Sequence, residues 1–117
     1  MGNAKNEYQG KHKRVLCVCS AGLLRSPSAA VVLSQPPFNY NTRAAGINPD
    51  FALVIVDDYL IHWADEIVCM NAEQAHKLKH DFDCDKTIVN LDIPDEFEYR
   101  DPKLMALIKE RYEQALA

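Results

Sequence analysis

Apolar and polar positions divide the chain into segments that are alternately typical of strands and of helices. Residues 15–19 are an unbroken run of Val, Leu and Cys, which is typical of a strand buried on both faces of a parallel sheet. Shorter apolar runs predict three more strands, and stretches with helical spacing lie between them. The predicted strands cover residues 15–19, 40–45, 66–70 and 86–91, and the predicted helices cover residues 27–34, 50–63, 72–80 and a segment that begins at 102 and includes Leu116.

Three of the four predicted helices begin with capping signals. Ser26 before Pro27 is typical of an N-cap followed by the first helical position. Asn71, with Gln74 three residues later, resembles a capping box. Asp101 precedes a proline and is expected to cap the last helix.

Residues 50–63 are the ambiguous segment. On composition alone, the apolar stretch at residues 51–56 favours a strand. Polar residues, among them Asp50 and His62, recur along one helical stripe, so a helix is predicted. The apolar surface of this helix is expected to be core, and a contact between two copies of the chain is the alternative.

The order of the predicted elements is β-α-β-α-β-α-β-α, with short connections. Such alternation implies an α/β fold in which helices cover both faces of a parallel sheet. The 117 residues are enough for one domain. We therefore predict a single-domain, three-layer sandwich with a four-stranded parallel sheet over residues 14–117, preceded by a disordered polar tail at residues 1–13.

The charge distribution narrows the function classes. The net charge is −4, and residues 1–14 hold four basic residues and one acidic residue, so they carry +3 and the remaining chain carries −7. An acidic body argues against a nucleic-acid-binding surface, so any anion site is expected to be local. Residues 1–14 have no apolar stretch typical of a secretory signal, so none is expected, and no apolar run approaches the ~18 residues of a membrane span. A cytoplasmic location is therefore expected, with no membrane partner.

The four cysteines, at positions 17, 19, 69 and 84, are expected to be reduced thiols. No Cys-x-x-Cys occurs, and the histidines do not combine with the cysteines at zinc-finger spacing. His76 and His80 are four residues apart and are expected on one helix face, as solvated side chains rather than metal ligands. No metal is predicted.

The segment from Cys19 to Pro27 follows the first strand, where ligands bind in such folds. Five residues separate Cys19 from Arg25, and Ser26 then starts a helix. Backbone N–H groups of a tight loop before a helix converge on an anion, and arginine offers a planar pair of donors to phosphate oxygens. Gly22 allows such a loop to turn inward. These surroundings favour the thiolate of Cys19, which is the nucleophilic form. The alternative is a buried strand cysteine beside a helix-capping loop.

A leaving oxygen also needs a proton, and a carboxylate at the same sheet edge would supply it. The acidic residues between the last strand and the last helix are the candidates. Asp95 follows a proline that stiffens its approach, and Asp101 is better explained as a helix cap. Asp92 lies close to the strand end and stays an alternative to Asp95.

Four segments, in order, resemble the low-molecular-weight protein tyrosine phosphatases. Residues 15–27 resemble the family signature, residues 43–46 its Ser-Ala-Gly segment, and residues 63–70 the Ala-Asp segment before its third strand. Residues 93–97 fall where the family has an Asp-Pro-Tyr acid loop. The resemblance runs from about Arg14 to the C-terminus and implies the flavodoxin-like fold of a compact, short-loop branch.

The resemblance also implies roles for individual residues. Cys19 matches the nucleophile that forms a phosphocysteine, and Asp95 matches the general acid that later acts as base. Phe97 matches a ring wall for the substrate, with a place in the core as the alternative. The predicted phosphate-binding residues are Ser20, Ala21, Gly22, Leu23, Leu24, Arg25 and Ser26.

The implied function is the hydrolysis of phosphotyrosine in a protein or of a small aryl phosphate, with inorganic phosphate as product. Neither a cofactor nor a metal is implied, and the chain is expected to be a monomer or a weak homodimer.

Three departures from the family keep alternatives open. Ala21-Gly22 replaces Gly-Asn in the loop, Leu24 replaces a second loop cysteine, and Glu96 replaces a proline in the acid loop. A looser loop would slow catalysis, so a weakly active phosphate-binding regulatory module is one alternative. Arsenate reduction on the same fold is the other, although it needs further cysteines to resolve the arsenical adduct.

Overall fold

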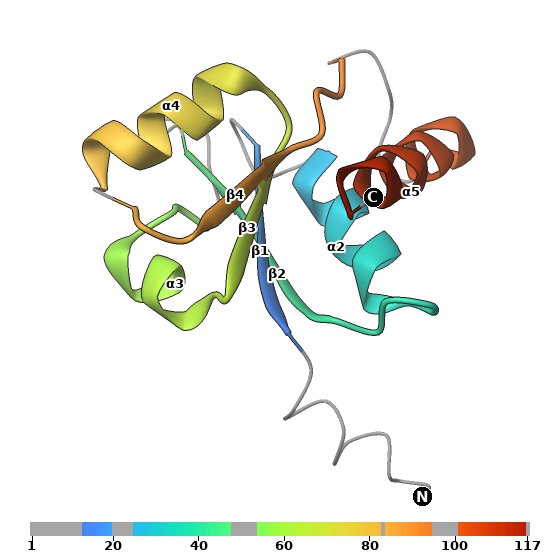
Figure 1. Ribbon diagram of the computed structural model, residues 1–117, viewed down its shortest axis with the longest axis horizontal. Coiled ribbons are helices and arrows are strands. Elements are labelled where there is room, and N and C mark those ends of the chain that lie inside the picture. Colours follow the sequence, from blue (N-terminus) through green and yellow to red (C-terminus); the bar gives the residue numbers. More distant parts are fainter. Residues whose placement is uncertain (1–12, 20–24, 48–53, 83, 95–100, 117) are drawn as a thin grey trace, which may run out of the picture.

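The computed structural model describes residues 13–19, 25–47, 54–82, 84–94 and 101–116, except for the side chains of Arg25 and Ser26. Strands and helices alternate along these residues (Figure 1). The strands are β1 (Arg14–Cys19), β2 (Asn41–Gly46), β3 (Glu66–Cys69) and β4 (Thr87–Asn90). The helices are α2 (Arg25–Ser34), α3 (Asp58–Trp63), α4 (Ala72–Asp81) and α5 (Pro102–Leu116).

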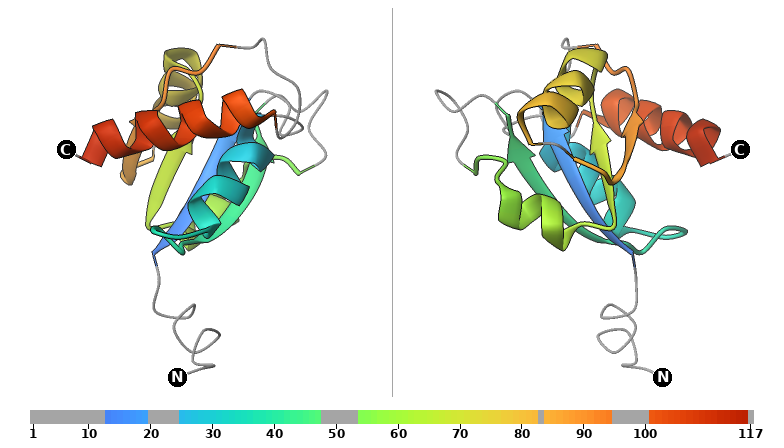
Figure 2. Two further views of the ribbon diagram at one scale, coloured as in Figure 1. Left: turned by 90° about the vertical axis from the view of Figure 1, so that its right-hand side faces the viewer. Right: turned by 60° about the vertical axis from the view of Figure 1, so that its left-hand side comes forward.

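The strands form a four-stranded sheet in the order β2-β1-β3-β4, and every pair in it is parallel. Helices α2 and α5 cover one face, and α3 and α4 cover the other (Figures 1 and 2). This arrangement confirms the predicted three-layer α/β sandwich. None of the described helices combines the length and the apolar character that crossing a bilayer requires.

The core lies in two layers, and β1 contributes to both. Val15, Cys17 and Cys19 belong to the cluster under α2 and α5, whereas Leu16 and Val18 belong to the cluster under α3 and α4. The side chains alternate because successive residues of a strand point to opposite faces. Residues 15–18 have no exposed surface, and burying an aliphatic side chain of this size contributes about 1.5–3 kcal/mol. The burial of β1 is what its unbroken apolar run predicts.

The predicted helix over residues 50–63 is wrong in its first part. Helix α3 begins at Asp58, and Ile55 forms a parallel bridge with Gly46 at the end of β2. The Gly46 N–H donates to the Val54 carbonyl at 2.8 Å. The β-branched Ile55 therefore pairs with a strand instead of continuing a helix. Asp57 is the N-cap of α3 and accepts from the Leu60 N–H at 2.9 Å. Residues 50–53 lie outside the described residues.

The predicted capping signals have mixed outcomes. Asn71 caps α4, because its side chain accepts from the Gln74 N–H at 2.9 Å. Asp101 precedes α5 and accepts from the Lys103 N–H at 2.9 Å. The prediction for Ser26 is wrong by position, because α2 already begins at Arg25 and Ser26 lies within its first turn.

A polar cluster joins α5 to the amino ends of the strands. The Tyr112 hydroxyl, buried in the core, donates to Glu66 Oε1 at 2.7 Å, and Lys13 Nζ lies 3.3 Å from Glu66 Oε2. Lys13 also lies over the ring of Tyr40, with 4.8 Å between Nζ and the ring centroid. Burial raises the pKa of the Tyr112 hydroxyl well above its usual value, and hydrogen bonds with Tyr40 and Glu66 raise it further. The buried Glu66 carboxylate therefore receives this hydrogen bond only while the Tyr112 hydroxyl is protonated.

Tyr112→Phe removes the buried donor to Glu66 and should lower the free energy of unfolding by about 1.5–3 kcal/mol. Urea denaturation at neutral pH measures this change. Because the folded-state pKa of Tyr112 is raised, its contribution is complete below about pH 10 and decreases as the pH rises further. The difference between wild type and variant should therefore narrow above pH 10. Tyr59→Phe is the matched control, because Tyr59 is 69% exposed. An equal decrease in the free energy of unfolding of the two variants would contradict the role of the buried hydroxyl.

Candidate active site

The carboxyl ends of β1 and β2 bring the predicted nucleophile to one edge of the sheet. Cys19 is the last residue of β1, pairs in register with Gly46, and accepts at its carbonyl from the Ile47 N–H at 2.9 Å. Its side chain is 3% exposed and belongs to the cluster under α2 and α5. Helix α2 begins at Arg25, six residues later. The strand before the predicted loop and the helix after it are therefore both present.

The structure describes only part of the predicted site. The backbone of Arg25 and Ser26 forms the start of α2, but their side chains are outside the description. The other predicted residues outside the described part are Ser20, Ala21, Gly22, Leu23, Leu24, Asp95 and Phe97. Their roles in catalysis and phosphate binding stay predictions.

The other cysteines do not share the position of Cys19 at the end of β1. Burial raises the pKa of the Cys17 thiol far above its usual range, and Cys19 and Glu66 raise it further. Burial also raises the pKa of Cys69 to about 11, although hydrogen bonds with the backbone around Asn71 and Ala75 oppose the shift. Cys69 and Cys84 pack in or against the cluster on the opposite face of the sheet. Cys17 and Cys69 are therefore protonated thiols near neutral pH, which suits core residues rather than nucleophiles.

Asp92, the alternative acid, begins the connection from β4 to α5. It is exposed and adopts a left-handed backbone conformation with φ of 55°, which aspartate tolerates better than most residues. Its N–H donates to Asn90 Oδ1 at 2.9 Å. From α5, Arg111 Nη1 donates to the carbonyl oxygens of Leu91 and Asp92 at 2.9 and 2.8 Å. Two side chains thus fix the backbone three residues before Asp95.

The same connection is held from the side of β3. The Ile93 N–H donates to the Met70 carbonyl at 2.8 Å, and the Met70 N–H donates to Oε1 of the buried Gln74 at 2.7 Å. A capping box predicts instead that the Gln74 side chain binds the Asn71 N–H. The sequence pattern therefore does not predict that Gln74 links the end of β3 to this connection. Nothing in the sequence singles out Arg111 as a residue that holds the β4–α5 connection. Both contacts depend on elements far apart in the chain.

The described residues hold no group of three or more His, Cys, Asp or Glu side chains that could bind a metal ion. His76 and His80 lie on the exposed side of α4, as predicted, with ring centroids 4.1 Å apart.

Neither a protein-family model nor a curated protein matches the sequence. Solved structures do match the fold. The YwlE arginine phosphatase from Geobacillus stearothermophilus has a TM-score of 0.66 at 20% identity, over 89% of this chain and 92% of that chain. The tyrosine phosphatase Wzb from Escherichia coli in complex with phosphate has a TM-score of 0.65 at 15% identity, over 89% and 96% of the two chains. Wzb from Vibrio vulnificus in complex with benzylphosphonate gives 0.64 at 16%, over 89% and 94%.

These matches span nearly the whole of each chain. The chain therefore has the fold of the low-molecular-weight protein tyrosine phosphatases.

Proposed function

We propose that this protein is a cysteine-dependent phosphatase that hydrolyses phosphotyrosine or related aryl phosphates. The observation that carries the proposal is the position of Cys19, which ends the central strand at the carboxyl edge six residues before α2 begins. This is the place where a strand, a short loop and a helix start would surround an anion with N–H groups. Solved structures with the same fold include tyrosine phosphatases.

The proposed reaction has two steps. The Cys19 thiolate attacks phosphorus, the bond from phosphorus to the leaving oxygen breaks, and Asp95 gives that oxygen its proton. Asp95 then takes a proton from water, which attacks the phosphocysteine, releases inorganic phosphate and restores the thiolate. Arg25 and the loop amides would stabilise the charge on the phosphoryl oxygens, and an oriented donor of this kind typically contributes ~10²–10³ in rate.

Two substrate classes are to be compared, phosphotyrosine and phosphoarginine. A neighbour with this fold is an arginine phosphatase and another is a tyrosine phosphatase. Phosphotyrosine is favoured here because Phe97 stands where a ring wall is implied by the resemblance. Turnover of phosphotyrosine and phosphoarginine peptides of matched sequence compares the two directly.

The two rival activities make different demands on the chain. Arsenate reduction needs thiols within reach of Cys19, but Cys69 and Cys84 pack toward the opposite face of the sheet. A phosphate-binding module without turnover would bind phosphopeptides and leave them intact.

Cys19→Ser should lower kcat for p-nitrophenyl phosphate by at least about 10³-fold, because a hydroxyl is not ionised at neutral pH. The steady-state release of nitrophenol by reduced protein measures this effect. Cys84→Ser is the control and should change kcat less than about twofold. Retained activity in Cys19→Ser, or none in the reduced wild type, would overturn the proposal.

Asp95→Asn should lower kcat by about 10²-fold or more, as expected for the loss of a general acid, and Asp92→Asn by less than about tenfold. Asparagine tolerates the left-handed conformation observed at Asp92, so this comparison leaves the backbone unstrained. Stopped assays with phenyl phosphate, whose leaving group requires the proton, show which of the two variants loses more kcat. The reverse order would assign the acid to Asp92.

Arg111→Gln should act through the acid, because Arg111 holds the backbone that leads to Asp95. We expect kcat to fall about tenfold for phenyl phosphate but only about twofold for p-nitrophenyl phosphate, whose leaving group needs little protonation. Lys109→Gln, an exposed change on the same helix, should leave both rates within about twofold. Equal losses on the two substrates would show a structural role alone.

A further inference from the structure

A cavity of about 210 Å³ lies at the opposite end of the sheet from Cys19. It is lined by Arg14, Tyr59, His62 and Trp63. Arg14 is the first residue of β1 and Cys19 is the last, so roughly 17 Å of extended strand separates the two ends. The cavity is therefore distinct from the candidate active site, and its use does not depend on the proposed phosphatase activity.

Helix α3 supplies the aromatic side of the cavity. Tyr59, His62 and Trp63 are spaced at three and four residues, so they share one face of the helix. Tyr59 and His62 are exposed, which leaves this face open to a ligand. The guanidinium of Arg43, from β2, lies over the Trp63 ring at 4.5 Å from its centroid. A cation thus already occupies one face of the tryptophan ring.

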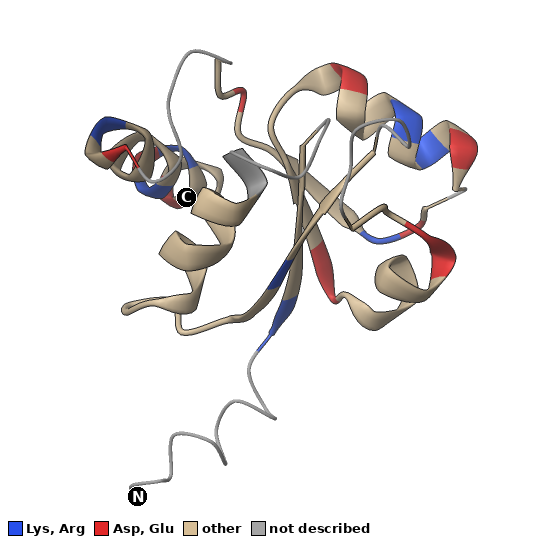
Figure 3. Ribbon diagram, turned by 180° about the vertical axis from the view of Figure 1, so that it is seen from behind, with Lys and Arg blue, Asp and Glu red and all other residues tan. Residues whose placement is uncertain are grey.

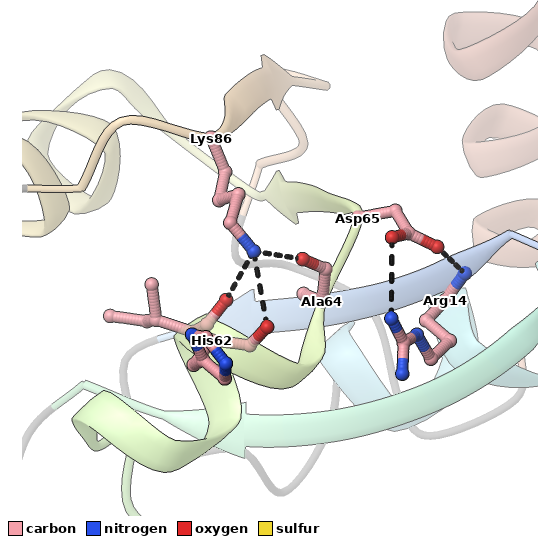
Figure 4. Close-up of polar contacts among 6 residues, drawn as sticks. Arg14, His62, Ala64, Asp65 and Lys86 are labelled. Carbon is pink, nitrogen blue, oxygen red and sulfur yellow. Dashed lines mark hydrogen bonds and ion pairs between the residues drawn. The ribbon is translucent and has the colours of Figure 1, made fainter.

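The strands and the connection before β4 supply positive charge. The Arg14 guanidinium lies 3.6 Å from Asp65, and both side chains are about half exposed, so a further anion can approach Arg14. Lys86 Nζ donates to the carbonyl oxygens of Ile61 and His62 at 3.1 and 3.2 Å, and also to that of Ala64 (Figure 4). These carbonyls form the negative end of α3, and Lys86 compensates their charge.

Among the residues that line the cavity, Arg14 carries the positive charge that a ligand would meet. Arg43 lies over Trp63 and Lys86 binds the carboxyl end of α3, so two more basic residues lie beside the lining residues, and Asp65 pairs with Arg14. Figure 3 shows basic residues at the start of β1 beside acidic residues at the start of β3. The acidic residues of α3 itself, Asp57 and Asp58, stand at its amino end.

We propose that this cavity is a second binding site, which takes a small aromatic anion. The ring of the ligand would lie against Tyr59 and Trp63, and its carboxylate or phosphate group would bind the Arg14 guanidinium, which suits planar oxyanions. The volume is below the ~300–1,000 Å³ of typical ligand pockets, so a single ring with one charged substituent fits best.

The single tryptophan of the chain makes the test direct, because Trp63 lines the cavity and its fluorescence reports on this site. Benzoate is the probe, since its carboxylate suits a guanidinium and it is not a phosphate ester that the candidate active site would hydrolyse. We expect saturable quenching with a dissociation constant in the millimolar range, as befits so small a ligand. Benzamide, the neutral analogue of the same shape, should bind at least about fivefold more weakly.

Three variants locate the site. Arg14→Gln and Tyr59→Ala should each weaken benzoate binding at least about fivefold, and Tyr59 is exposed enough for its removal to leave the fold intact. Asp65→Asn should tighten binding about threefold, because it removes the competing carboxylate. Lys109→Gln, an equal change of charge on α5, should leave the dissociation constant unchanged, and Cys19→Ala should do the same.

The proposal fails if benzoate does not quench Trp63 saturably, or if benzamide binds equally well. It also fails if both Arg14→Gln and Tyr59→Ala bind benzoate as wild type does. Phenylphosphonate then distinguishes the two kinds of anion: tighter binding than benzoate, lost in Arg14→Gln, would identify a phosphate ligand, and weaker binding would identify a carboxylate.

Discussion

The rest of the structure depends on the burial of β1 between two parallel neighbours. Its backbone pairs with β2 on one side and β3 on the other, and its side chains fill both core layers. A strand held in this way can neither shift its register nor rotate, because a one-residue slip would exchange the two faces. The strand therefore fixes Cys19 at one edge of the sheet and Arg14 at the other. Both proposed sites are consequences of this one element.

The two edges are built by different kinds of interaction. At the carboxyl edge, side chains hold backbone: Gln74 binds the Met70 N–H, and Arg111 binds the carbonyls before the acid segment. At the amino edge, Lys86 also binds backbone carbonyls, but other side chains bind one another, as in the contacts of Glu66 with Lys13 and Tyr112. Fixed backbone is what an active-site segment needs, because it orients the residues that follow. Paired side chains stabilise the fold and leave the cations only partly compensated.

The sequence predicts most of the fold because local pattern and tertiary structure agree in it. The apolar run at residues 15–18 has to be buried on both sides, and Asn71 has to cap a helix wherever α4 packs. The helix predicted for residues 54–57 was wrong because an apolar stretch with scattered polar residues suits either a strand or a helix. The pairing of Ile55 with Gly46 decides between the two. The contacts of Arg111 and Lys86 could not be predicted, since each joins elements about twenty residues apart or more whose juxtaposition only the sheet order determines.

These contacts show where two of the basic residues of the chain lie and which acidic residues they pair with. Lys13 and Arg14 account for part of the basic charge before the acidic body, yet Glu66 and Asp65 already pair with them at the amino edge. The hydrogen bond from the Arg14 N–H even lowers the pKa of the Asp65 carboxyl, so this pair stays ionised at mildly acidic pH. These cations therefore do little to attract a phosphate dianion to the opposite edge. Attraction there has to come from groups close to Cys19, which is why the proposed phosphatase depends so strongly on Arg25 and on the amino end of α2.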